Sequence, residues 1–345
     1  MKTKYFTLSA FIAIATVMAP RADACTGISL KAKTGDVVMA RTIEWSGSDM
    51  NTYYVVVPKG HTPNTKYAYT GVAVELPEYI MEGVNEKGLS AGLFYFPDYG
   101  KYPDESQAAG KTSVSDFELV AYILSCCSNI EEVKSTVNSL YIHGVDPRSS
   151  TVHWRFIEEG GRQVVLEIID GEYIFYENPV GVLANSPSFD FHLTNLNNYV
   201  NLLPGKAEQN NLGRMSLNSF SGGTGLLGLP GDFSSTSRFV RAAFLQNTAP
   251  VKDDATQTVI QAFHLLNSFD LPIGAAYSKD QTPVDIPSAT HVTVATDLKG
   301  HKLYYRTLHN CEIRCIDLNK VNFKKTGYMA KPLDKVKAET IHQLF

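Results

Sequence analysis

The first 24 residues decide where the folded part of this chain begins. Two lysines precede an apolar run over residues 5–19, and the small-x-small triplet Ala-Asp-Ala ends at residue 24. A basic start, an apolar run too short to span a bilayer and such a triplet are typical of a cleaved secretory leader. We therefore predict that residues 1–24 are a signal peptide and that the mature chain begins with Cys25. The alternative is an N-terminal helix buried in the core.

The rest of the chain has the composition of a globular domain. Of 345 residues, 44% are hydrophobic and 19% are charged, unlike a disordered or fibrous chain. We predict one domain over residues 25–345, because no repeat or linker divides it. With the leader removed, this domain is expected to be exported to the periplasm or the extracellular space. The net charge of -4 gives no basic surface for nucleic acid, and no later stretch is apolar enough to span a membrane. A small molecule is the expected partner.

Strand-like runs arrive in pairs around polar turns, first at 26–30 and 37–41 and then at 79–81 and 89–96. Consecutive hairpins of this kind favour antiparallel sheets. A capping box at Ser115-Asp116-Phe117-Glu118 predicts the start of a helix. Further helices are expected at 130–140, 235–246 and 254–266, and further strands at 151–157, 163–169, 291–295 and 302–306. This succession predicts an α+β domain of packed sheets covered by helices.

A mature N-terminal cysteine combines a nucleophile and a base in one residue. A cysteine thiol titrates near 8.5 and a free α-amine near 7.7 to 8.0, so the two groups can exchange a proton. Cys25 could therefore attack a carbonyl without a histidine partner. The alternative is a lipoprotein, in which Cys25 would be acylated and its amine blocked. Ala22 at the usual apolar position and Asp23 in the small-residue slot fit a lipoprotein signal poorly.

Two charged residues near the first hairpin are candidates for supporting the thiol. Arg41 lies on the neighbouring expected strand, and a cation beside a cysteine lowers the thiol pKa. Glu44 follows three residues later and could accept a hydrogen bond from the ammonium group of Cys25. From spacing alone, however, a solvated surface ion pair is the favoured interpretation, since such pairs are common.

The other four cysteines give no metal signature. Cys126 and Cys127 lie in an apolar helical run, which favours buried free thiols. Cys311 and Cys315 lack a second ligand pair nearby, so zinc is not expected. A disulfide between Cys311 and Cys315 remains an open alternative in an oxidising compartment. We predict neither a metal nor a cofactor.

Several motifs together resemble the choloylglycine hydrolase and penicillin V acylase family of N-terminal-nucleophile hydrolases, and they span essentially the whole mature chain. They are, in order, Cys25-Thr26-Gly27, Arg41-x-x-Glu44-Trp45, Asn85-Glu86-Lys87-Gly88-Leu89, Asn185-Ser186-Pro187-Ser188-Phe189-Asp190-Phe191 and Gly231-Asp232-Phe233-Ser234-Ser235-Thr236-Ser237-Arg238-Phe239. The resemblance implies the four-layer αββα fold, with two stacked antiparallel sheets between helix layers. It also implies a homotetramer or a homodimer.

The resemblance assigns roles to individual residues. It makes Cys25 the nucleophile and Arg41 the cation at its sulfur, and it gives Asn185 the role of side-chain donor in the oxyanion hole. Arg238 resembles the family's second catalytic arginine, although a surface helix arginine is the alternative. The family commonly has Asp at the position of Glu44, so this carboxylate must reach the amine from one methylene farther away.

The resemblance also predicts the chemistry. The expected activity is that of an exported cysteine amidase cleaving a linear C–N amide bond, with glycine- or taurine-conjugated bile salts as first substrates. Tyr95 aligns where many bile salt hydrolases have Asn and several penicillin acylases have Tyr, so we place it in the substrate site. Penicillin V and N-acyl homoserine lactones are therefore the alternative substrates. A non-catalytic lipoprotein binding module is the alternative of another class.

Overall fold

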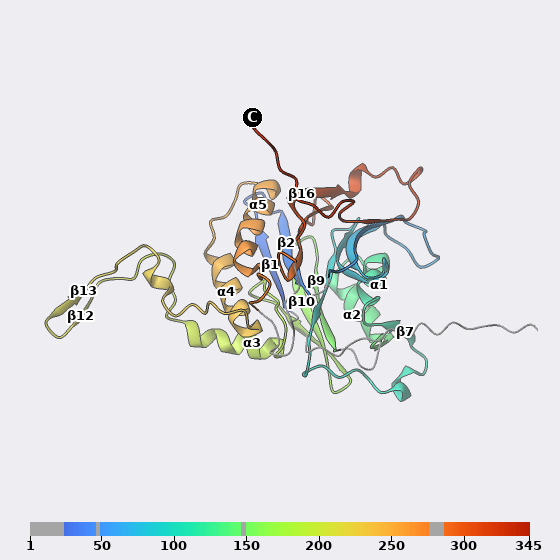
Figure 1. Cartoon of the computed structure of the whole chain (residues 1–345). Coiled ribbons are helices and arrows are strands. Elements are labelled where there is room, and N and C mark those ends of the chain that lie inside the picture. Colours follow the sequence, from blue (N-terminus) through green and yellow to red (C-terminus); the bar gives the residue numbers. More distant parts are fainter. Residues whose placement is uncertain (1–23, 46–48, 146–149, 276–285) are drawn as a thin grey trace, which may run out of the picture.

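The computed structural model describes residues 24–45, 49–145, 150–275 and 286–345. Two antiparallel sheets are stacked in these residues, one of five strands and one of eight (Figure 1). The small sheet has the order β1-β2-β14-β15-β16. Its strands are β1 (Cys25–Lys31), β2 (Val37–Glu44), β14 (Thr290–Asp297), β15 (Lys302–Thr307) and β16 (Asn310–Asp317).

The large sheet has the order β11-β10-β9-β6-β5-β4-β3-β17. Its strands are β3 (Thr52–Val57), β4 (Tyr69–Val74), β5 (Ile80–Asn85), β6 (Ser90–Tyr95), β9 (Val152–Ile157), β10 (Gln163–Ile169), β11 (Glu172–Glu177) and β17 (Met329–Pro332). A separate parallel pair consists of β7 (Thr112–Ser115) and β8 (Leu140–His143). Most strands thus pair with a strand close in sequence, as the successive hairpins predict.

Helices cover the outer face of each sheet. The helices α1 (Leu119–Cys126) and α2 (Ile130–Asn138) pack on the large sheet, and α4 (Ser235–Thr248) and α5 (Ala255–Leu266) pack on the small one (Figure 1). A fifth helix, α3 (Phe189–Asn195), contacts α4. Short 3₁₀ turns occur at η1 (Glu105–Ala108), η2 (Leu196–Tyr199), η3 (Thr224–Leu226), η4 (Asn267–Phe269) and η5 (Leu318–Lys320). The predicted αββα layering is confirmed.

Apolar side chains fill the spaces between these layers. One cluster joins the inner face of the small sheet, through Ile43 and Val294, to the large sheet and to α1 and α2. A second cluster packs β1 and β2 against α4 and α5, with Phe239 and Phe263 contributed by the helices. These two clusters hold the small sheet from both sides, which fixes the strand that begins with Cys25.

Within the described residues no helix is both long and apolar enough to cross a bilayer.

The predicted start of the first helix is wrong. Ser115 ends β7, and its hydroxyl donates to the Glu118 carboxylate at 2.5 Å, so neither side chain caps the helix backbone. Helix α1 begins later, at Leu119. The expected helix at 130–140 is also shorter, because Leu140 starts β8 and pairs with Thr112. The pairing of β8 with β7 thus ends α2 earlier than the apolar pattern of the sequence predicts.

A hairpin arm stands away from the body of the molecule (Figure 1). Its two strands are β12 (Asn210–Leu212) and β13 (Met215–Leu217), which pair only with each other among the described residues. Leu212 and Met215 at the end of the arm are 71% and 65% exposed. An isolated two-stranded hairpin gains little stability from its own contacts, and these apolar side chains have no cover within the described chain.

Candidate active site

Cys25 opens β1, the edge strand of the small sheet, and its side chain is fully buried. Burial raises the pKa of the thiol, the charges of Arg41 and Arg238 lower it, and the charge of Glu44 raises it. A hydrogen bond from the backbone of Glu44 also lowers the thiol pKa. Ala24 still precedes Cys25 here, so the Cys25 nitrogen is a peptide amide that stands in for a free α-amine. The predicted nucleophile thus lies among the three predicted charged residues.

Asn185 holds the nitrogen of Cys25. The Cys25 backbone N–H donates to Asn185 Oδ1 at 2.7 Å, and Arg238 Nη2 donates to the same oxygen at 2.8 Å. Asn185 Nδ2 donates to the Tyr95 carbonyl at 2.9 Å. Two donors at the oxygen and one acceptor at the nitrogen leave a single consistent orientation of the amide. The second hydrogen of Nδ2 takes no part in these contacts and can donate to an oxyanion. The contact between Asn185 Oδ1 and the Cys25 nitrogen was not predicted from the sequence.

Arg238 is a buried residue, 1% exposed, so its interpretation as a surface helix arginine is wrong. It lies in the first turn of α4, whose N-cap residue Ser234 accepts from the backbone of Ser237. Its Nη1 donates to the Cys25 carbonyl at 2.5 Å, and its Nε donates to the Phe233 carbonyl at 2.9 Å. The guanidinium therefore ties the start of α4 to the residue that carries the thiol.

Arg41 reaches from β2 across the space between the sheets. Its Nη1 donates to the carbonyls of Leu93 at 2.5 Å and Met81 at 3.0 Å, and its guanidinium lies 3.8 Å from the centre of the Phe94 ring. Its Nη2 has no hydrogen-bond partner in the described part of the chain. A buried cation with a free N–H beside the thiol is what the predicted role of Arg41 requires.

Glu44 is buried at the end of β2, 1% exposed. Its Oε1 accepts from the Thr290 hydroxyl at 3.1 Å, and its Oε2 lacks a partner among the described residues. Burial raises the pKa of Glu44 to about 7, against the lowering effect of the Arg238 charge. The surface ion pair considered above is therefore wrong, and the carboxylate keeps one oxygen for a further donor. Thr290 reaches it because β14 pairs with β2 at that position.

Tyr95 lies at the end of β6 and is 1% exposed. Its ring centre is 5.7 Å from that of Trp45 and 6.4 Å from that of Phe117. The backbone carbonyl of Tyr95 is the group that accepts from Asn185. Tyr95 therefore contacts the site through its backbone, and its ring belongs to an aromatic wall beside it.

Two buried histidines hold the backbone around Asn185. His153 Nε2 lies 3.1 Å from the Ala184 carbonyl, and His192 Nε2 lies 2.8 Å from the Asn185 carbonyl. His153 Nδ1 faces the Glu167 carboxylate at 3.1 Å. Burial lowers the pKa of His192 to about 4, so this ring is neutral near pH 7 and donates from Nε2. The carbonyls of two consecutive residues are thus fixed by imidazole rings.

A buried ion cluster supports Arg41 from the large sheet. Glu82 Oε2 lies 3.7 Å from Arg41 Nη1 and 3.8 Å from Arg155 Nη2, and all three residues are almost fully buried. Burial raises the pKa of Glu82 to about 7, opposed by both arginine charges. A Cβ at Gly92 would clash with the Glu82 carboxylate, so glycine at this position leaves room for it. One carboxylate between two cations leaves the cluster with net positive charge near the thiol.

Sequence reasoning missed several of these contacts. Local sequence patterns do not single out His153, Thr290, Glu82 or His192 as site residues. His192 directly follows the motif that begins at Asn185, so its position in the chain was a usable signal. Thr290 and Glu82 gave no local signal, because strand pairing across the fold brings them to the site.

The remaining cysteines lie elsewhere and are free thiols. Cys311 and Cys315 are four residues apart on β16, which places their Cα atoms about 13 Å apart in an extended strand and rules out a disulfide between them. Cys127 is buried as predicted, whereas Cys126 is only half-buried. Within the part of the chain that the structure describes, no three His, Cys, Asp or Glu side chains could together hold a metal ion.

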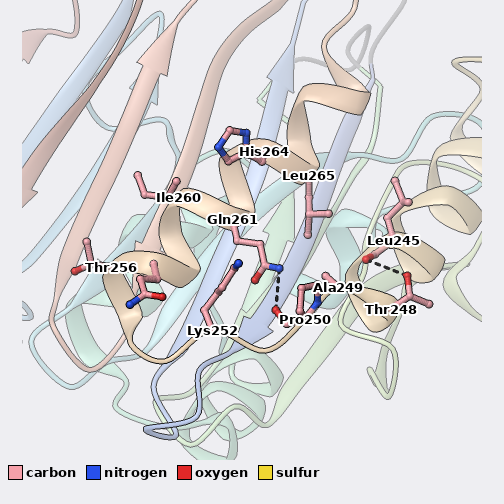
Figure 2. A pocket seen from close by; sticks show the side chains of 11 residues that line it. Leu245, Thr248, Ala249, Pro250, Lys252, Thr256, Ile260, Gln261, His264 and Leu265 are labelled. Carbon is pink, nitrogen blue, oxygen red and sulfur yellow. Dashed lines mark hydrogen bonds between the residues drawn. The ribbon is translucent and has the colours of Figure 1, made fainter. Parts of the chain in front are cut away.

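A separate groove lies between the end of α4 and α5, with a volume of about 720 Å³ (Figure 2). It is lined by Leu245, Ile260, Leu265 and neighbouring side chains, and the Gln261 amide crosses it to donate to the Pro250 carbonyl at 2.9 Å. None of its lining residues hydrogen-bonds to Cys25, Asn185 or Arg238. The predicted site residues therefore lie in the buried cluster at the start of β1 and not in this groove.

Comparison with known proteins shows the family to which the chain belongs. The model of the family described as linear amide C–N hydrolases, choloylglycine hydrolase family, matches residues 25–331. A bile salt hydrolase/transferase of Clostridium perfringens is 32% identical, over 86% of this chain and 93% of the relative. A penicillin V acylase of Pectobacterium atrosepticum is 28% identical, over 73% of this chain and 65% of the relative.

Solved structures give the same result for the fold. A structure of a conjugated bile acid hydrolase variant from Clostridium perfringens matches with a TM-score of 0.79 and 30% identity, covering 93% of this chain and all of that chain. The family match begins at Cys25, the first residue of the small sheet, and ends within the strand β17 of the large one. The chain belongs to the choloylglycine hydrolase family and is a hydrolase of linear amide C–N bonds.

Proposed function

We propose that this protein is an exported bile salt hydrolase in which Cys25, freed by removal of residues 1–24, is the nucleophile. The observation that carries the proposal is the hydrogen bond from the Cys25 nitrogen to Asn185 Oδ1 at 2.7 Å. That contact would orient a free α-amine just as it orients the peptide nitrogen. Arg41, Arg238 and Glu44 supply the surrounding charges.

The proposed reaction divides the work among these groups. The α-amine of Cys25 takes the thiol proton, and the thiolate attacks the amide carbonyl carbon of the substrate. The second N–H of Asn185 Nδ2 stabilises the oxyanion that forms. The α-ammonium then gives its proton to the leaving nitrogen, the C–N bond breaks and a thioester remains on Cys25. Water, deprotonated by the same amine, attacks the thioester, releases the acid and returns the thiol.

Glu44 and Arg41 have supporting roles in this scheme. The unpartnered Oε2 of Glu44 is available to accept a hydrogen bond from the α-ammonium. Arg41 is a positive charge that favours the thiolate, offsetting part of the rise in thiol pKa caused by burial. Arg238 holds the Cys25 carbonyl and Asn185 together, so it acts as a positioning residue.

Bile salts are the first proposed substrates, because relatives named as bile salt hydrolases match most of the chain. Penicillin V is the second candidate, supported by the penicillin V acylase among the relatives and by the tyrosine at position 95. N-acyl homoserine lactones are the third candidate. All three are linear amides with a bulky or long apolar acyl group.

The test compares kcat/KM of the purified mature protein for glycocholate, taurocholate, penicillin V and an N-acyl homoserine lactone. We expect the conjugated bile salts to be cleaved fastest and Cys25→Ala to remove all turnover. Ile260→Ala on the outer face of α5 is the matched control, and it should keep wild-type rates. Activity on none of the four substrates would refute the proposal.

Export and maturation need their own measurement. N-terminal sequencing and intact mass of the secreted protein should give a chain that begins with an unmodified Cys25. A mass increase at that residue would identify the lipoprotein alternative, since acylation blocks the amine that the mechanism requires.

A further inference from the structure

Ala24, the last residue of the predicted leader, is buried next to the nucleophile. Its side chain is 6% exposed and packs in a small apolar cluster with Leu271 and Ala289, which are also buried. The partly buried side chains of Phe233 and Ile273 complete this cluster. Ala24 is bonded to the Cys25 nitrogen, so the cluster begins one covalent bond from the proposed base.

Hydrogen bonds fix the walls of this small pocket independently of Ala24. The Ala289 N–H donates to the Leu271 carbonyl at 2.8 Å, and the Trp45 N–H donates to the Ala289 carbonyl at 2.9 Å. The Phe233 carbonyl accepts from Arg238 Nε at 2.9 Å. The walls therefore keep their positions when Ala24 leaves, because none of these bonds involves it.

We propose that the volume vacated by Ala24 is the subsite for the amine portion of the substrate, and this inference rests on the proposed function. In the proposed reaction the α-amine of Cys25 hands a proton to the leaving nitrogen, which must lie within about 3 Å of it. Ala24 occupies this position beside the Cys25 nitrogen in the present structure. The acyl group extends from the other side of the carbonyl carbon, away from the subsite.

The lining of the subsite defines the class of amine that it accepts. The apolar side chains packed around Ala24 favour the carbon next to the leaving nitrogen over a charged end at this point. In the present structure it is filled by a residue whose side chain is a single methyl group. Amines with an unbranched or methyl-bearing α-carbon fit, whereas a branched α-substituent such as that of valine would meet Leu271 and Ala289.

The test varies the amine while the acyl group stays constant. The substrates are the glycine, alanine and valine conjugates of cholic acid and its primary amide, whose leaving group is ammonia and needs no subsite. Wild type should cleave the glycine and alanine conjugates at similar kcat/KM and the valine conjugate at least about tenfold more slowly, the usual effect of extra methylenes in a closed pocket.

Two variants should shift this preference in opposite directions. Ala289→Leu fills the subsite, so the ratio of kcat/KM for the glycine conjugate to that for the primary amide should fall about tenfold. Ile273→Ala enlarges it, so the ratio of the valine to the glycine conjugate should rise by a similar factor. Ile260→Ala, which lies in the groove of Figure 2, should leave both ratios unchanged.

The outcomes separate the two hypotheses. If wild type cleaves the conjugates and neither variant changes the amine ratios, the subsite assignment is wrong while the proposed function stands. The same holds if the variants change the preference between cholic and other acyl groups at constant glycine. If wild type cleaves no conjugate, both the proposed function and the subsite fail.

Discussion

In the proposed reaction, Asn185 offers different atoms to the Cys25 nitrogen and to a substrate oxyanion. Asn185→Asp keeps an oxygen for Cys25 and Arg238 but removes the N–H groups of Nδ2. We expect kcat to fall about 10²–10³-fold, the usual loss for one oxyanion-hole donor, with little change in KM. Steady-state kinetics on the best substrate measure this, and an unchanged kcat would exclude the oxyanion role.

His192 makes the position of Asn185 sensitive to acid. Its folded-state pKa, about 4, lies below the ordinary value of 6.5, so the unfolded chain binds more protons between these two values. The stability that neutral His192 contributes is complete above about pH 6.5 and is lost as the pH falls toward 4.

His192→Gln isolates this effect, because glutamine donates a hydrogen bond but does not titrate. The difference in melting temperature between wild type and His192→Gln should therefore shrink or reverse between pH 7 and pH 4.5. Thermal unfolding across that range measures it, with His264→Gln on the surface of α5 as the control. Parallel curves for wild type and His192→Gln would contradict the prediction.

Strands of both sheets share the cluster of Arg41, Glu82 and Arg155, which come from β2, β5 and β9. Glu82→Gln leaves two buried guanidinium groups without a carboxylate, so we expect a loss of about 3–5 kcal/mol in unfolding free energy. Glu82→Gln combined with Arg155→Met removes one of the unpaired charges and should recover part of that loss. Urea unfolding of the single and double variants measures both, and a double variant no more stable than Glu82→Gln would refute the coupling.

Sequence patterns predicted the elements whose pairing partners lie close by in the sequence. The hairpin of β1 and β2 has alternating strands around a turn, and the structure places Gly27 opposite Arg41 within it. The strand β17 has four residues and pairs with β3 from the far end of the chain, so no local pattern announced it. The error at Ser115 has the same origin, since the parallel partner of β7 lies beyond α2.

The site divides in the same way. Cys25, Arg41 and Glu44 belong to one hairpin, and their local sequence made them candidates. Spacing alone could not separate Arg41 and Glu44 from a surface ion pair. Asn185 and Arg238 came from the resemblance to a family, because segments so far apart in sequence carry no mutual spacing signal. The contact of Asn185 with the Cys25 nitrogen depends on the position of an amide in three dimensions, which the sequence does not encode in any simple pattern.

At the scale of the molecule, we expect the exposed apolar end of the hairpin arm to contact a second copy of the chain. This expectation matches the dimer or tetramer that the resemblance implies. Leu212→Asp combined with Met215→Asp places charges on the exposed apolar end of the arm. We expect a lower molar mass in size-exclusion chromatography with light scattering, with no change in the melting temperature of the body. Val336→Asp, an exposed residue outside the arm, is the control. An unchanged mass would exclude the arm as the contact.

The bond between Ala24 and Cys25 is enclosed by the fold, since both residues are buried. A peptidase needs an accessible, extended backbone, and the closed small sheet withholds this bond from it. Under the proposed maturation, the cut after Ala24 would therefore come while the chain is still open, before α4 and β14 close over the start of β1. On the same proposal, full-length protein made without export would fold first and keep residues 1–24, so it would lack the terminal amine.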